Sequence, residues 1–172
     1  YKEIDDKKGM GDSYNNIGNI FKDQGNDKNA LEYYSKSLAL SKKTGYKQGI
    51  GYSYNNIGNI YKNHGNYEKA LVYQLKSLKI KEEINDKTGI GYAYGNIGII
   101  YDYQGNYEKA LEYFFKSLSI VDELSNKRGM GSSYHNIGHI YHNQGNYEKA
   151  LEYYSKSLAI SKETGDKRLM GH

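Results

Sequence analysis

The sequence predicts an all-α fold, an α-solenoid of stacked antiparallel helix hairpins. One nine-residue phrase recurs every 40 residues, as SYNNIGNIF at 13–21, SYNNIGNIY at 53–61, AYGNIGIIY at 93–101 and SYHNIGHIY at 133–141. Within each repeat the apolar side chains return three or four residues apart, which is the period of an amphipathic helix. Short self-similar helical repeats bury their apolar faces by stacking on their neighbours, so no single central core is expected.

The period divides the chain into four repeats, which we place at residues 11–50, 51–90, 91–130 and 131–172. The last of these includes the start of a further helix. Residues 1–10 match the end of a repeat in register, so we expect them to be the tail of a preceding repeat. The sequence therefore reads as a segment of a longer array.

Each repeat predicts two helices. In the second repeat, Tyr54, Ile57 and Ile60 mark the first helix, and Ala70, Leu71, Leu75 and Leu78 mark the second. Gly65 suits the left-handed position that ends the first helix, and Asn66 can cap the second. Second helices are expected to end near Thr44–Gly45 and Thr164–Gly165. The first helix of a following repeat can be capped by Asp86, Asn126 or Asp166.

The repeat resembles the tetratricopeptide repeat, whose pattern is Trp, two residues, Leu-Gly, two residues, Tyr, then Ala, three residues, Phe. In the third repeat this pattern reads Tyr94, Ile97, Gly98, Tyr101, Ala110, Phe114. Tyr replaces Trp, Gln74 replaces the aromatic residue of the second repeat, and the usual terminal Pro is absent. The 40-residue length resembles the Leu-Gly-Asn repeat proteins, which include G-protein signalling modulators, and bacterial tetratricopeptide regulators. The resemblance implies a right-handed superhelix whose concave wall is formed by the first helices.

An Asn precedes the Ile-Gly pair in every repeat and is expected to face this groove. An Asn side chain has one acceptor and two donors, so it can bridge a C=O and an N–H of an extended peptide. In the Leu-Gly-Asn repeat proteins such Asn residues contact the peptide main chain, which implies the same role here; Ile99 and His139 depart from that pattern. The alternative is that each Asn bonds to neighbouring helix backbone and only tightens the stack. The predicted peptide-binding set is Asn16, Asn19, Tyr52, Asn56, Asn59, Tyr92, Asn96, Ile99, Tyr103, His135, Asn136 and His139.

The groove is predicted to be close to neutral, with Lys22 and Lys62 as a weakly positive end. A clamp for a chaperone's terminal carboxylate would need Lys or Arg where the chain has Asn15, Tyr92 and Asn96. That class of ligand is therefore not expected.

His135, His139 and His142 lie at i, i+4 and i+7 of one helix and are weak candidates for metal ligands. The set occurs in one repeat and lacks the glutamate of an HExxH motif, so we predict no metal site and no cofactor. GIGYAYG at 89–95 has the glycines of a dinucleotide loop, but no strand precedes it and its glycines follow the repeat. No catalytic set stands out, so the chain is not predicted to be an enzyme.

Composition excludes further classes of function. There is no cysteine for disulfides or thiolate metal sites, and the net charge of +4 comes from interspersed Lys and Glu, without the basic patch typical of nucleic-acid binding. No apolar run is long enough to span a membrane, and the expected location is cytoplasmic.

Three hypotheses for function follow. The leading one is a protein-interaction scaffold whose groove binds an extended peptide of a partner through an Asn ladder. The second is head-to-tail self-association through the apolar side of the last second helix, around Leu151, Tyr154 and Leu158. The third is a sensor or regulatory part of a larger signalling protein.

Overall fold

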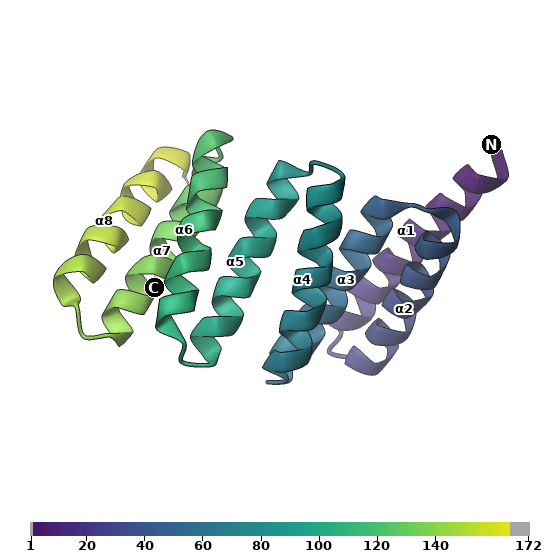
Figure 1. Cartoon of the computed structure of the whole chain (residues 1–172), viewed down its shortest axis with the longest axis horizontal. Helices are drawn as coiled ribbons and strands as arrows, with labels where there is room; N and C mark the ends of the chain where they lie inside the picture. The colour runs from purple at the N-terminus through teal and green to yellow at the C-terminus, as the bar shows by residue number, and fades with distance from the viewer. Residues whose placement is uncertain (1, 166–172) are drawn as a thin grey trace. The chain divides into compact units, whose positions relative to one another are not determined.

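The structure, a computed structural model, describes residues 2–165, and within that range the chain forms eight α-helices and no strands (Figure 1). This confirms the all-α fold. The predicted start of a further helix, with its predicted cap Asp166, lies outside the described residues. The helices are α1 (Lys2–Asp23), α2 (Asp27–Thr44), α3 (Lys47–Asn63), α4 (Tyr67–Glu83), α5 (Lys87–Tyr103), α6 (Tyr107–Glu123), α7 (Lys127–Asn143) and α8 (Tyr147–Thr164).

The turn inside each hairpin has the geometry that the sequence predicts. Gly65 has φ 71°, a left-handed conformation that costs glycine nothing. The Oδ1 atom of Asn66 accepts a hydrogen bond from the backbone N–H of Lys69 at 3.1 Å and so caps α4. The other three hairpins use the same pair of residues, Gly25–Asn26, Gly105–Asn106 and Gly145–Asn146.

The turns between hairpins are less uniform. α2 and α8 end at Gly45 and Gly165, as predicted, both with positive φ. α4 and α6 are followed instead by Asn85 and Ser125, which adopt positive φ without being glycine. Asn126 caps α7 by accepting from the N–H of Gly129 at 3.0 Å, which confirms that prediction.

The chain forms two compact units, each made of two stacked hairpins. The N-terminal unit contains α1–α4 and ends at Asp86, and the C-terminal unit contains α5–α8 and begins at Lys87. Within each unit every helix packs on the next, and the two first helices, α1 and α3 or α5 and α7, also touch directly. The predicted repeat boundaries at residues 50, 90 and 130 fall inside α3, α5 and α7, and residues 2–10 are the beginning of α1. The division into repeats stays a prediction, because a periodic sequence has no unique starting point.

Each unit has its own core, built from small and β-branched residues around one large ring. In the N-terminal unit the core contains Ala30, Tyr34, Ile57 and Ile60. In the C-terminal unit it contains Ala110, Phe114, Ile137 and Ile140. The predicted stacking role of the Ile and Ala positions is confirmed, whereas Tyr54 and Tyr61 are only half-buried and pack on Tyr73.

The repeated glycine of the first helices allows the second helix to approach. A Cβ atom on Gly98 would lie 2.6 Å from the Phe114 ring, and one on Gly18 would lie 2.5 Å from the Tyr34 ring. A glycine inside a helix costs about 1 kcal/mol relative to alanine. The close contact with a buried ring offsets that cost.

Candidate functional site

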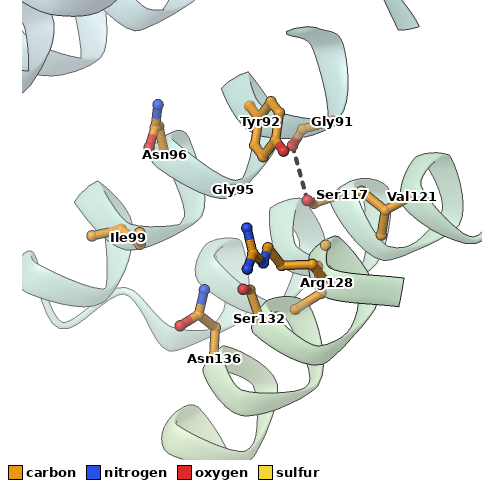
Figure 2. A pocket seen from close by; sticks show the side chains of 12 residues that line it. Gly91, Tyr92, Gly95, Asn96, Ile99, Ser117, Val121, Arg128, Ser132 and Asn136 are labelled. Carbon is orange, nitrogen blue, oxygen red and sulfur yellow. Dashed lines mark hydrogen bonds between the residues drawn. The ribbon is translucent and has the colours of Figure 1, made fainter. Parts of the chain in front are cut away.

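The first helices of each unit enclose a cavity on the side where they lie next to each other. In the N-terminal unit this cavity measures about 380 Å³, and its lining includes four residues of the predicted set, Asn16, Asn19, Tyr52 and Asn56. In the C-terminal unit a cavity of about 210 Å³ is lined by four others, Tyr92, Asn96, Ile99 and Asn136 (Figure 2). The structure therefore brings eight of the twelve predicted residues together, as two groups of four.

The Asn residues of the N-terminal cavity bond to one another across the two helices. Asn15 is only 6% exposed and donates to Ser53 Oγ at 3.3 Å. Asn56 donates to Asn15 Oδ1 at 3.4 Å and accepts from Asn55 at the same distance. Asn56 thus takes part in a contact between α1 and α3. The acceptor is a side chain of the neighbouring first helix, Asn15, whereas the alternative prediction was a bond to helix backbone.

Asn19 and Asn59, two other predicted peptide contacts, pair with the second helix of their own hairpin. Asn19 Oδ1 accepts from the hydroxyl of Tyr34 at 2.8 Å, and Asn59 Oδ1 accepts from Gln74 Nε2 at 3.1 Å. Burial, with Asp23 and Asp27 nearby, raises the pKa of Tyr34 to about 12, so its hydroxyl stays a donor at neutral pH. Each Asn oxygen therefore has one of its two acceptor positions occupied within the hairpin.

In the first three repeats the residue at this position changes together with the residue fifteen positions later, whereas the fourth repeat has His139 with a tyrosine, Tyr154. Asn19 faces Tyr34, Asn59 faces Gln74, and Ile99 packs on the cluster that contains Phe114. A polar residue on the first helix is matched by a donor on the second, and the apolar Ile99 is matched by a ring without a hydroxyl. Gln74, which departs from the aromatic pattern, is explained by this pairing. The joint change was present in the sequence, but we interpreted the two positions separately.

Glycine at position 95 shapes the C-terminal cavity. Asn15, Asn55 and His135 hold the same place in the other repeats. A Cβ atom on Gly95 would meet nothing closer than Ser117 Oγ, at 3.6 Å, which is an ordinary van der Waals contact, so a methyl group fits there. Ser117, on α6, already donates its hydroxyl proton to the carbonyl of Gly91 at 2.9 Å (Figure 2).

Arg128 is a lining residue that the sequence analysis missed. Figure 2 shows its side chain reaching from α7 toward α5, close to Ser132 and Asn136. It is the one charged residue among the described residues that line this cavity, whereas Asp12 is the one in the N-terminal cavity. Arg128 was missed because the predicted binding residues of this repeat begin at His135, whereas α7 begins earlier, at Lys127.

The predicted histidines turn toward different helices. The ring of His135 lies 5.4 Å from that of Tyr154, and the ring of His142 lies 5.7 Å from that of Tyr147, both on α8. His139 faces α5, with its Nε2 atom 3.5 Å from Asp102 Oδ2. Among residues 6–165, whose side chains the structure describes, no three His, Cys, Asp or Glu side chains are grouped so that they could hold a metal ion.

Partial burial and the neighbouring His139 lower the pKa of His135. Burial raises the pKa of Asp102, and His139 opposes that shift.

Tyr103, at the end of α5, is 60% exposed and does not line the cavity. None of the helices described is long and apolar enough to cross a lipid bilayer.

Comparison with known proteins identifies the repeat. Family models of the tetratricopeptide repeat match residues 9–83, 50–123 and 132–163. No curated protein sequence matched the chain.

Three solved structures illustrate the likeness of fold. Aspartyl phosphate phosphatase F from Bacillus subtilis is 20% identical, with a TM-score of 0.90 over 95% of this chain and 43% of that one. A Rap protein complexed with competence and sporulation factor is 21% identical, with a TM-score of 0.86 over 98% of this chain and 46% of that one. A signal transduction ATPase with numerous domains and a tetratricopeptide repeat sensor, from Pyrococcus horikoshii, is 24% identical, with a TM-score of 0.85 over 94% of this chain and 25% of that one. The chain thus spans less than half the length of each of these proteins.

Proposed function

The chain belongs to the tetratricopeptide repeat family, and from that premise we propose that it is a non-enzymatic scaffold that binds an extended peptide segment of a protein partner. The binding surface is the side of each unit where its first helices lie next to each other. The observation that carries the proposal is the cavity between α5 and α7, which has amide side chains at Asn96 and Asn136 and apolar side chains at Ile99 and Val121. Such a mixture suits a peptide, whose main chain needs hydrogen bonds and whose side chains need apolar contacts.

The hydrogen bonds inside the structure refine the proposed Asn ladder. Asn19 and Asn59 each accept one hydrogen bond within the hairpin, from Tyr34 and Gln74, so one of the two acceptor positions of each oxygen is already used. Asn136 borders the cavity on α7 and is half-buried. We therefore assign the bridging contact in the C-terminal unit to Asn136, with Asn16 as its counterpart in the N-terminal unit.

The solved structures support this function by analogy. One neighbour is a Rap protein complexed with competence and sporulation factor, and another carries its tetratricopeptide repeats as a sensor. Both suggest a regulatory setting in which the repeats detect a partner. The fold alone is shared, so the partner of this chain has to be found by experiment.

A displayed random-peptide library, selected on the immobilised chain, tests the proposal. Peptides enriched by the wild-type protein should bind Asn136→Ala about fivefold or more weakly, because a lost hydrogen bond costs about 1 kcal/mol. The melting temperature should stay unchanged. No enrichment on the wild-type chain, or an equal loss of binding and stability in Asn136→Ala, would contradict the proposal.

A second candidate is self-association through α8, the helix on which the sequence analysis predicted it. Leu151 is 67% exposed and Tyr147 is 63% exposed on that helix. Light scattering over a dilution series should then show a mass that rises with concentration, and Leu151→Lys should abolish the rise. A mass that does not depend on concentration would remove this candidate.

A further inference from the structure

The C-terminal cavity lacks a side chain that its N-terminal counterpart has in its wall. In the N-terminal unit the Asn15 side chain lines the cavity between α1 and α3 and bonds to Ser53. At the corresponding place in the C-terminal unit the residue is Gly95, and Ser133, the counterpart of Ser53, lines the cavity. The amide group that borders one cavity is therefore absent from the other.

The walls of this cavity favour an apolar group. Val121 and Ile99 contribute aliphatic surface, and the hydroxyl proton of Ser117 is already donated to Gly91. Among the described residues the buried side-chain atoms without a hydrogen-bond partner are Ser41 Oγ and Gln74 Oε1, and neither lines the cavity. No buried side-chain atom of this lining therefore needs an ordered water as its partner, and the aliphatic part of the wall can be covered by an aliphatic side chain.

The cavity is large enough for such a side chain. Its volume of about 210 Å³ far exceeds the ~30 Å³ that one water molecule occupies in the liquid. A Cβ atom added to Gly95 would still leave its nearest neighbour, Ser117 Oγ, at 3.6 Å. A larger polar side chain at position 95 would instead take up part of this volume.

The charge of the site comes from Arg128. It is the one charged residue among the described lining residues, and its side chain reaches from α7 toward α5 (Figure 2). A guanidinium group pairs with a carboxylate through two parallel hydrogen bonds, and it does so more specifically than a lysine. The N-terminal cavity has Asp12 in its lining and therefore carries the opposite charge.

We propose that the cavity between α5 and α7 is an anchor pocket for an aliphatic side chain of a peptide, and that Arg128 recognises a carboxylate group next to that side chain. The ligand is thus a peptide in which Leu, Ile, Val or Met adjoins Asp, Glu or the terminal carboxylate. This inference rests on the proposed function and adds the sequence preference of its C-terminal unit.

The test uses the displayed random-peptide library with three forms of the full chain. Wild-type protein should enrich peptides with an aliphatic residue beside an acidic one. Gly95→Asn puts an amide side chain into the cavity wall at the place that Asn15 holds in the N-terminal unit, and the enriched peptides should bind this variant at least tenfold more weakly. Arg128→Gln should keep the aliphatic preference, lose the acidic one, and remove most of the dependence of binding on salt concentration.

Controls separate the pocket from the fold. Gly95→Ala adds one methyl group beside Ser117 and should leave the melting temperature unchanged or higher, which shows whether the fold tolerates a side chain at this position. If Gly95→Asn lowers the helix content, backbone amide NMR of the wild-type chain decides instead. Addition of an enriched peptide should then shift the signals of Gly95, Ser117 and Gly129 more than those of α2.

The outcomes distinguish this inference from the proposed function. Enriched peptides that depend on Asn136 but tolerate Gly95→Asn, or that lack an aliphatic–acidic pair, would overturn the pocket and leave the scaffold in place. Failure to enrich any peptide on the wild-type chain would overturn both.

Discussion

Two glycines of the same helix, α5, have opposite roles in packing. Gly98 lies against the Phe114 ring, where a Cβ atom would come within 2.6 Å, whereas a Cβ atom on Gly95 would be 3.6 Å from its nearest neighbour. The first glycine is required by packing. The second leaves a space that the packing does not use.

Substitution of these two glycines by alanine should therefore have opposite effects on the free energy of unfolding. Gly98→Ala should lower it by about 1–3 kcal/mol, because the added methyl group overlaps a buried ring that cannot move freely. Gly95→Ala should leave it unchanged or raise it by up to about 1 kcal/mol through helix propensity. Urea denaturation of both variants measures the difference, and equal destabilisation would refute the assigned roles.

His135 makes the stability of the chain sensitive to mild acid. Its pKa lies below the usual 6.5 in the folded state because it is partly desolvated and lies near His139. As the pH falls through 6.5, the unfolded chain takes up a proton that the folded chain still refuses, so stability decreases. His135→Asn, which restores the residue found at positions 15 and 55, should lose less stability than wild type between pH 8 and pH 5.

The control for this experiment is the comparison at pH 8, where His135 is neutral in both states. Titrating groups that do not interact with His135 are common to the two proteins and cancel in the difference, which therefore reports His135 together with its interaction with His139. Thermal denaturation across this pH range gives the curves. If they stay parallel, His135 does not titrate differently on folding.

At the scale of the helix hairpin, the two helices are matched by pairs of residues that change together. Asn59 accepts from Gln74, which is fully buried, and the equivalent pair in the C-terminal unit is Ile99 with Phe114. The buried amide needs a polar partner and the ring needs an apolar one. The pair, and not the single position, is what the hairpin requires.

A double-mutant cycle at this pair should show clear coupling. Asn59→Ile alone removes a partner from buried Gln74 and should cost about 1–3 kcal/mol. Adding Gln74→Phe should recover much of that loss, because the combination is the one already present as Ile99 and Phe114. Urea denaturation of the single and double variants gives the coupling energy, and simple additivity would show that the pairing does not matter.

The helices and their turns could be predicted from the sequence because their determinants are local. Apolar spacing within ten residues marks a helix, and the Gly65–Asn66 pair marks a turn, whatever surrounds it. The contacts of Asn15 with Ser53 and of Asn19 with Tyr34 could not be predicted in this way, because they depend on how two helices are placed against each other. The cavity at Gly95 and the position of Arg128 in its lining could not be predicted for the same reason. A missing side chain leaves no pattern along the chain, and the sequence does not show that an arginine near the start of a helix borders a cavity.

At the scale of the whole molecule, the chain consists of two units that each bury their own core. α1–α4 form one and α5–α8 the other, and the core clusters around Tyr34 and Phe114 each lie within a single unit. In stacked repeats, stability is close to a sum over repeats and their neighbouring contacts. A local change should therefore have a local effect.

Hydrogen exchange of Gly98→Ala should show this directly. Amide protection should fall in α5–α8 and much less in α1–α4, because the clash with Phe114 lies in the C-terminal unit. A uniform loss of protection over all the helices would mean that the chain unfolds as one cooperative body. The matching variant Gly18→Ala, which clashes with Tyr34, should give the reverse distribution.

The pairing of Asn19 with Tyr34, of Asn59 with Gln74 and of Ile99 with Phe114 also bears on how such an array can grow. Both members of each pair belong to one hairpin. A duplication or deletion of a whole 40-residue period copies or removes the two together, so it leaves each of these three pairs intact. Recombination that joins two different repeats between the paired positions would break the match. The bond of Asn15 to Ser53, by contrast, joins neighbouring hairpins and depends on which repeats are adjacent. Changes of length by whole periods therefore preserve the contacts inside a hairpin, while exchange inside a hairpin breaks them.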